Sequence, residues 1–195
     1  MNDRPALIAE KPARASHSIA DSAFVLHTYP YRETSVIAEV FTRQHGRIVL
    51  VARGAKRPRS ATRGVLQPFQ PLSATWFGRS EMKTLKSVEQ ERILPQLSGA
   101  ALLSAFYTNE LLLKLTHRDD PHQGLFEAYR EALQVMADIA ARGGDPIRLA
   151  TTLRVFEVRL LRELGYALQL AEEADSHVPI DPSRDYAYHL ERGPV

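Results

Sequence analysis

Eight positively charged side chains fall between Val40 and Ser80, and this stretch contains no Asp or Glu. They are Arg43, Arg47, Arg53, Lys56, Arg57, Arg59, Arg63 and Arg79. Because the whole chain holds 25 Lys and Arg against 23 Asp and Glu, such a window indicates one strongly basic region rather than an evenly basic surface. Guanidinium groups bind phosphate oxygens and stack on bases, so the chemistry that these residues favour is the binding of a polyanion.

The order of residues in this window places the charges beside two strands. An apolar run ends near Thr42, Gly46 marks a tight turn, and a second apolar run spans residues 46–52. Residues 53–64 contain no apolar side chain larger than Ala, so they predict a mobile basic loop projecting from a sheet. We expect nucleic acid to bind at Arg43, Arg47, Arg53, Lys56, Arg57, Arg59 and Arg63. The alternative is a solvated surface loop that only aids solubility.

Side chains suited to catalysis or metal binding are sparse. The chain has no Cys, which excludes thiol catalysis and cysteine-based zinc sites. The tightest polar cluster is His117 to His122, and Pro121 places its two histidines on different elements, so we interpret it as a charged connection between helices. The run from Arg53 to Lys56 lacks the spacing of a phosphate-binding loop. We therefore expect a protein that is not an enzyme, with no catalytic residue, no metal and no cofactor.

Five strand-like runs precede three helical ones, which predicts an α+β protein. The strand-like runs are 23–29, 34–41, 46–52, 69–77 and 83–93, and five short strands without helical periodicity favour a small five-stranded barrel of the OB or SH3 type. Helical periodicity then covers residues 98–116, about 121–142 and 145–164. We expect a disordered lead-in over 1–18, the barrel over 19–95, and a helical domain over 96–195 whose last part, 166–195, is turn-rich with a small hairpin near 181–190.

Aromatic and basic residues outside the loop have two interpretations each. Trp76, Phe77 and Phe69 are candidates for base stacking, although aromatic side chains in strands more often belong to the core. On the third helix, Arg148, Arg159 and Arg162 share one face, which either extends a binding track or is simply solvated. No apolar run approaches the roughly 20 residues of a membrane helix, and residues 1–18 lack a signal-peptide stretch, so we expect a cytoplasmic protein without membrane contacts.

Several short blocks resemble, in the same order, the RecO family of recombination mediators. In the predicted barrel they are Ala23-Phe-Val-Leu-His, Glu33-Thr-Ser, Val40-Phe-Thr, Gly46-Arg, Ala52-Arg-Gly-Ala, Arg59-Ser and Leu66-Gln-Pro-Phe. In the predicted helices they are Asn109-Glu-Leu-Leu, Leu153-Arg-Val-Phe-Glu and Leu164-Gly-Tyr. The resemblance covers roughly residues 19 to 195.

The resemblance implies an N-terminal OB-fold followed by an all-helical domain, in a bacterial protein associated with the nucleoid. It also implies binding of single- and double-stranded DNA without sequence specificity and annealing of complementary strands. The implied partners are RecR, the C-terminal tail of the single-strand-binding protein and, indirectly, RecA, which the family helps to load. From its place beside Phe156 in the matched block, Arg154 is the candidate anchor for that acidic tail next to an apolar pocket; an exposed helix arginine is the alternative.

Two features depart from the family pattern. Many members carry a four-cysteine zinc module after the Leu-Gly-Tyr block, whereas residues 168–188 contain no cysteine here, so we expect a zinc-free member with a degenerate module over 166–195. The chain ends at Val195, where relatives continue into further helices, so we expect a shortened C-terminus. The competing functions are a general single-strand binder without mediator activity and a scaffold whose basic loop meets an acidic protein.

Overall fold

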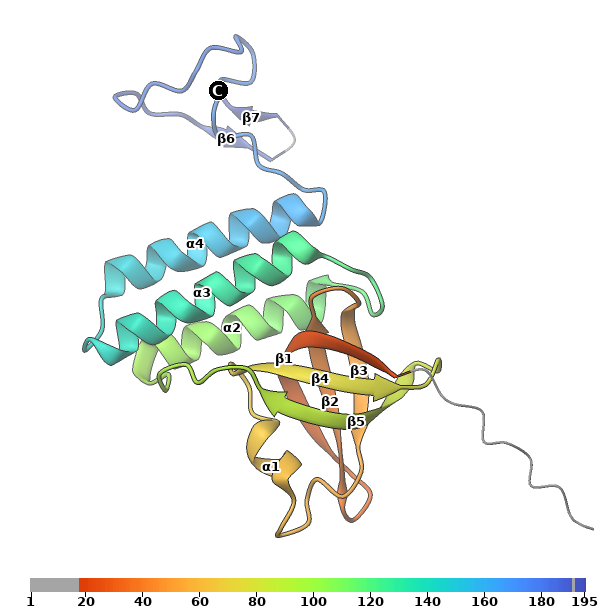
Figure 1. The fold of residues 1–195 in the computed structure, drawn as a ribbon. Helices are drawn as coiled ribbons and strands as arrows, with labels where there is room; N and C mark the ends of the chain where they lie inside the picture. The colour runs from red at the N-terminus through yellow and green to blue at the C-terminus, as the bar shows by residue number, and fades with distance from the viewer. Residues whose placement is uncertain (1–17, 191) are drawn as a thin grey trace, which may run out of the picture.

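A closed barrel of five strands forms the first half of the chain in the computed structural model, which describes residues 18–190 and 192–195 (Figure 1). The expected lead-in over 1–18 thus falls almost entirely outside the described residues. The strands are β1 (Ile19–Tyr31), β2 (Ser35–Thr42), β3 (Gly46–Ala52), β4 (Pro71–Phe77) and β5 (Met82–Gln90), in the barrel order β1-β2-β3-β5-β4. All neighbouring pairs are antiparallel except β3 and β5, which run parallel. The predicted five-stranded OB-type barrel followed by helices is confirmed.

Alternating side chains fill the barrel, because successive residues of a strand point to opposite faces. Val25, Val40 and Leu50 are among the residues that point inward, and Trp76 is fully buried with them. Phe69 is buried as well, in the core shared with the helices. Trp76 and Phe69 are therefore core residues, and the hypothesis that either stacks on bases is wrong; Phe77 is half-buried.

Gly46 makes the turn between β2 and β3 and also permits a close approach of another loop. Its φ of +65° lies in the left-handed region, and a Cβ at this position would lie 1.9 Å from the carbonyl oxygen of Asp120. The loop after α2 can therefore lie directly against the barrel, where the amide of Asp119 donates to the carbonyl of Arg47 at 2.8 Å.

Three helices follow, and Figure 1 shows them stacked one above another with α2 nearest the barrel and α4 farthest from it. They are α2 (Gly99–Leu115), α3 (Gln123–Ala141) and α4 (Pro146–Glu163), close to the predicted ranges. Asp145 caps α4 by accepting a hydrogen bond from the amide of Arg148 at 3.0 Å, and Pro146 occupies the first turn. Ser98 sits at the cap position of α2, but its side chain makes no capping hydrogen bond.

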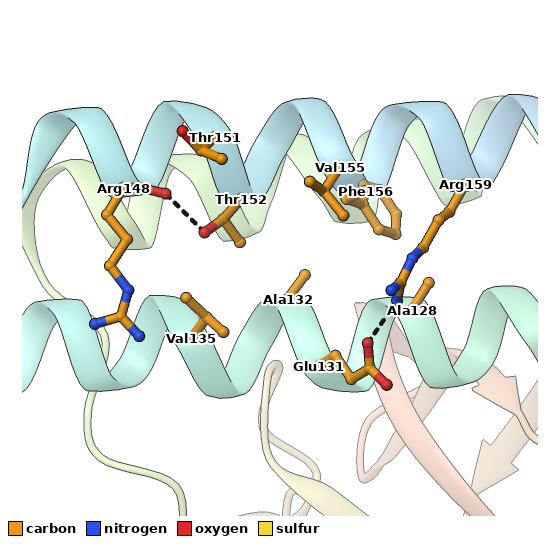
Figure 2. A pocket seen from close by; sticks show the side chains of 10 residues that line it. All are labelled: Ala128, Glu131, Ala132, Val135, Arg148, Thr151, Thr152, Val155, Phe156 and Arg159. Carbon is orange, nitrogen blue, oxygen red and sulfur yellow. Dashed lines mark hydrogen bonds and ion pairs between the residues drawn. The ribbon is translucent and has the colours of Figure 1, made fainter. Parts of the chain in front are cut away.

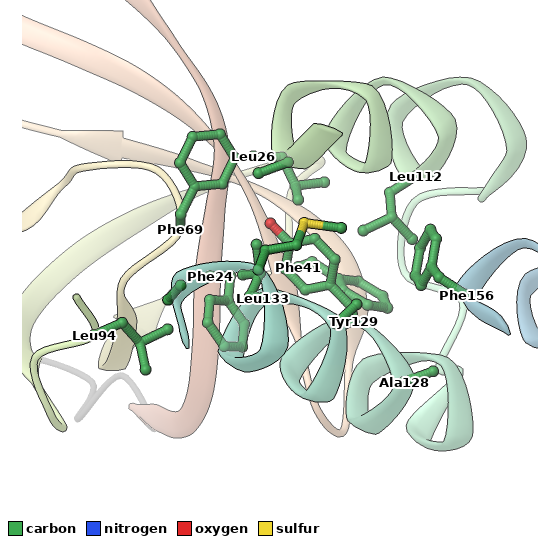
Figure 3. Packing of buried hydrophobic residues seen from close by; sticks show 14 of the residues in the cluster. Phe24, Leu26, Phe41, Phe69, Leu94, Leu112, Ala128, Tyr129, Leu133 and Phe156 are labelled. Atoms are coloured by element: carbon green, nitrogen blue, oxygen red, sulfur yellow. The ribbon is translucent and has the colours of Figure 1, made fainter. Parts of the chain in front are cut away.

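One hydrophobic core joins the barrel to the helices (Figure 3). Phe24 and Phe41 point outward from β1 and β2, and both rings lie within 6.2 Å of the rings of Phe126 and Tyr129 on α3. Tilted and edge-to-face ring pairs of this kind add to the free energy of burial. The helices consequently cover one part of the outer barrel surface and leave the rest of it open.

The last part of the chain lies beyond α4 and contains one short hairpin (Figure 1). A hairpin was expected near residues 181–190, but the strands that pair are β6 (Tyr188–His189) and β7 (Gly193–Pro194). The carboxylate of Glu173 accepts hydrogen bonds from Ser176, Arg184 and Tyr186 and holds the preceding loops. Across the described ranges, no group of three or more His, Asp or Glu side chains has a geometry that could hold a metal ion.

Candidate nucleic-acid interface

The basic segment, residues 53–65, is folded against the barrel at the end that lies away from the helices (Figure 1). The amide of Lys56 donates to the carbonyl of Thr34 at 2.9 Å, and two further turn hydrogen bonds join Arg57 to Gly54 and Ser60 to Arg57. Ala55 is buried in the barrel core, and the short helix α1 (Ala61–Val65) completes the segment. The prediction that the segment contributes nothing to the core is wrong, because Ala55 is buried there and the amide of Lys56 is bonded to Thr34.

Most of the cations in the basic segment point to solvent. Arg53, Arg57, Arg59 and Arg63 are all exposed, while Lys56 is half-buried and its ammonium lies 3.5 Å from the carbonyl oxygen of Arg32. Within the described part of the chain, the predicted DNA-binding residues that form ion pairs are Arg43 and Arg47, and the four exposed guanidinium groups form none. Unpaired, solvated guanidinium groups can bind phosphate without first breaking an internal salt bridge.

Two clefts flank the basic segment. The larger, of about 780 Å³, lies where the turns after β1, β3 and β4 meet and is lined in part by Arg53, Arg57, Arg32, Tyr31 and Met82. The smaller, of about 440 Å³, lies on the other side of the segment and is lined in part by Lys56 and Arg63. The segment therefore presents charge to two neighbouring concave surfaces at one end of the barrel.

Arg43 and Arg47 lie apart from this surface. Arg43 is exposed, but it pairs with Glu127 of α3 at 3.1 Å, beside the helices. Arg47 is only 13% exposed, and its guanidinium donates to Glu39 at 3.0 Å and to the carbonyl of Thr116 at 2.8 Å. Since these contacts occupy the Arg47 guanidinium, its predicted role in binding DNA does not fit the structure; the residue joins the barrel to the loop after α2.

Glu39 is the centre of that junction. It is buried, and its carboxylate pairs with Arg47 and also with Arg118, which bonds Glu81 as well. The hydrogen bond to Glu39 is the main reason that the pKa of Arg118 lies above its ordinary value. Both guanidinium groups are bound to the Glu39 carboxylate, so the junction ties the barrel to the loop after α2 rather than offering a free binding site.

On α4, the predicted partner-binding residue and the nearest groove lie on different faces. Arg154 is exposed and pairs with Glu157 at 2.7 Å, and Glu157 also accepts from Tyr107 of α2, which raises the pKa of that tyrosine. Figure 2 shows a groove between α3 and α4, of about 310 Å³, with Val135, Val155 and Phe156 among its lining residues. Its arginines are Arg148 and Arg159, so the expected neighbourhood of Arg154 and an apolar pocket at Phe156 is not found.

Three residues of the larger cleft were missed by the sequence analysis. Tyr31 and Arg32 precede the acid-free window that drew attention to the other cations, and Met82 follows it. His27 and Tyr29 alternate in the predicted strand 23–29 and so share one face, whereas Tyr31 lies in the predicted connection after that strand and carried no such signal.

Family models and curated relatives agree with this architecture. The model described as "Recombination protein O N terminal" matches residues 17–93, and "Recombination protein O C terminal" matches residues 96–192. The chain belongs to the RecO family. It is 52% identical over 173 residues to the DNA repair protein RecO of Aromatoleum aromaticum, which covers 89% of this chain and 69% of the relative.

Two other RecO relatives are similarly close. The DNA repair protein RecO of Ralstonia nicotianae is 54% identical over 182 residues, with 93% of this chain and 64% of the relative covered. The DNA repair protein RecO of Nitrosospira multiformis is 51% identical over 176 residues, with 90% of this chain and 70% of the relative covered. The chain thus spans about two thirds of the length of the RecO proteins that it matches. No helix among the described residues is both long and apolar enough to cross a membrane.

Proposed function

We propose that this chain acts in DNA repair as a recombination mediator. It binds single- and double-stranded DNA without reading sequence, anneals complementary strands, and helps to load RecA onto strands coated by the single-strand-binding protein, together with RecR. The proposal rests on membership of the RecO family and places the activity in the bacterial cytoplasm at the nucleoid. It includes no catalytic step and no cofactor.

The observation that carries the DNA-binding part is that Arg53, Arg57, Arg59 and Arg63 are exposed at one end of the barrel and form no ion pair with any other described residue. Contacts to phosphates supply affinity but little base information, so such a cluster grips any sequence. Two strands bound near the same cations repel each other less, which lets them search for register. Annealing requires little more from the protein than this neutralisation.

Fluorescence anisotropy of a labelled single-stranded oligonucleotide across a salt series tests the assignment. Each phosphate contact on a single strand contributes about 0.7 to the steepness of log K against log salt. If the four arginines contact phosphates, changing all four to Ser therefore reduces that steepness by roughly 3. A matched variant removes four cations from the second half of the chain instead, at Lys114, Arg130, Arg142 and Arg184. Equal slopes in the two variants would place the DNA elsewhere on the molecule.

The acidic tail of the single-strand-binding protein is the proposed protein ligand of α4. Arg154 supports this because it is exposed and lies near an uncovered apolar face of α2, on which Leu103 is 72% and Phe106 49% exposed. Leu103 and Tyr107 are four residues apart and share that face, and Tyr107 contacts the Arg154 partner Glu157. The groove between α3 and α4 is a second possible binding site for the tail, because Arg148 and Arg159 line it together with apolar side chains.

Two other functions make different predictions. A general single-strand binder would bind DNA with the same salt dependence but neither engage the single-strand-binding protein nor accelerate annealing of coated strands. A scaffold for an acidic protein would not bind DNA at moderate salt. Annealing of complementary strands coated by that protein, with and without RecR, separates the mediator from both alternatives.

A further inference from the structure

The outer face of β1, β2 and β3 is uncovered on the part of the barrel that the helices do not reach. Tyr29 pairs with Ile37, which in turn pairs with Val51, and these three side chains point outward because their neighbours Ala38 and Leu50 lie in the barrel core. Tyr29 is 46% exposed, and Ile37 and Val51 are partly exposed. A mixed aromatic and aliphatic sheet surface is thus open to solvent.

Aromatic rings form a row along β1 on this face. His27, Tyr29 and Tyr31 occupy alternate positions, and the rings of His27 and Tyr29 lie 4.5 Å apart between centroids. Met82, which is 46% exposed, lies on the same side of the barrel, opposite Val49 in the β3–β5 pairing. Flat π faces and a polarisable thioether suit planar, uncharged ligands rather than phosphate.

Cations border the row at the end where the basic segment lies. The guanidinium of Arg32 sits 5.1 Å from the centroid of the Tyr31 ring, and Tyr31, Arg32, Arg53 and Arg57 line one cleft. Arg32 has a φ of +50°, in the left-handed region that is unfavourable for a residue with a side chain. The ammonium of Lys56 lies 3.5 Å from the carbonyl oxygen of Arg32, so the basic segment reaches this turn.

We propose that this face is a base-stacking platform for single-stranded DNA, on which Tyr29 and Tyr31 receive unpaired bases while Arg32, Arg53 and Arg57 hold the adjoining phosphates. The inference rests on the proposed DNA-binding function and adds strand preference to it. Alternate residues of a strand are about 7 Å apart, roughly twice the 3.4 Å rise of a base in duplex DNA. Bases on both rings must therefore be unstacked from each other, which a duplex does not allow.

The test compares a Tyr29→Ser/Tyr31→Ser double variant with a Tyr29→Phe/Tyr31→Phe control that keeps both rings. Stacking of one base on an aromatic ring contributes a factor of about 5 to 150 in affinity, so the serine variant loses at least tenfold on a single-stranded oligonucleotide. Its affinity for a duplex of the same length changes less than twofold. The phenylalanine variant binds both DNAs as the wild type does. Circular dichroism and thermal unfolding check that each variant is folded.

An oligonucleotide with abasic sites gives an independent reading. Wild type binds it at least tenfold more weakly than the intact strand, whereas the serine variant binds the two about equally. Unchanged single-strand affinity in the serine variant, or an equal loss on duplex, would overturn the platform. The DNA-binding proposal would still stand if the four-arginine variant lost its salt dependence. Failure of the wild type to bind either DNA would overturn both.

Discussion

Arg47 forms an ion pair with the buried Glu39, with 3.0 Å between Nη1 and Oε2, at the point where β2 and β3 meet the loop after α2. Removing one partner of a buried pair costs about 3–5 kcal/mol, because the other charge is left desolvated. Since Arg118 still pairs with Glu39, we expect Arg47→Ser to lower the free energy of unfolding by about 3 kcal/mol, at the low end of this range.

Urea unfolding measures this change, with Arg43→Ser as the matched control. Arg43 also pairs with a glutamate, but at the surface, where such pairs contribute about 0–1 kcal/mol. The slope of DNA affinity against salt should be the same in Arg47→Ser as in the wild type. A flattened slope in a folded Arg47→Ser protein would restore Arg47 to the DNA-binding set.

Asn109 links the barrel to two helices through one buried amide. Its Nδ2 donates to the carbonyl of Leu26 on β1 at 2.8 Å, and its Oδ1 accepts from the hydroxyl of Tyr129 on α3. Asn109→Ala leaves the Leu26 carbonyl and the Tyr129 hydroxyl buried without these partners, which costs about 1–3 kcal/mol for each group. We therefore expect the free energy of unfolding to fall by about 3 kcal/mol. Tyr107→Phe removes a tyrosine hydroxyl at the surface and should change stability by under 1 kcal/mol. Thermal unfolding of the two variants compares them directly, and a loss below 1 kcal/mol in Asn109→Ala would contradict the link.

The barrel and the helices could be predicted from the sequence because their signals are local. Alternating apolar residues around Trp76 predict β4, and Asp145 followed by Pro146 predicts the start of α4. The roles of the arginines could not be predicted in this way. Arg43 and Arg47 are as cationic as Arg57 in the sequence, and only folding brings Glu127 and Glu39 to the first two.

Local sequence also does not show which small residues are buried or which way a helical side chain faces. Ala55 is buried in the barrel core, but the sequence prediction considered only apolar side chains larger than Ala. Arg154 and Phe156 are two positions apart in the sequence. Side chains at this spacing point about 200° apart around a helix axis, so these two face different surfaces. Tyr29 shares a face with His27 in the predicted strand 23–29, but the structure extends β1 to Tyr31, and whether this face is covered depends on where the helices pack.

Replacement of Arg154 should show where the acidic tail peptide binds. Arg154→Ala is expected to weaken binding of a fluorescent peptide about tenfold, as hydrogen bonds to charged groups contribute about 1.5–3 kcal/mol. Glu157→Gln removes the carboxylate that occupies Arg154 and should tighten binding. Anisotropy titrations measure both, with Arg148→Ala/Arg159→Ala as the comparison. Unchanged affinity in Arg154→Ala, with a loss in the double variant, would move the tail into the groove between α3 and α4.

The loops that precede the C-terminal hairpin should loosen in acid through Glu173. Hydrogen bonds from Ser176 and Tyr186, with the nearby Arg184 charge, hold the pKa of Glu173 below its ordinary value of 4.5. A carboxylate whose pKa is depressed by folding stabilises the folded state above its unfolded pKa, and this contribution is lost as the pH falls through the folded pKa. We therefore expect the side-chain carboxyl carbon of Glu173 to titrate below about pH 4.5 when followed by NMR, and Glu173→Gln to remove that signal. Glu172→Gln, one residue away and exposed, should retain it. A midpoint at or above 4.5 in the wild type would mean that these hydrogen bonds do not hold the segment in solution.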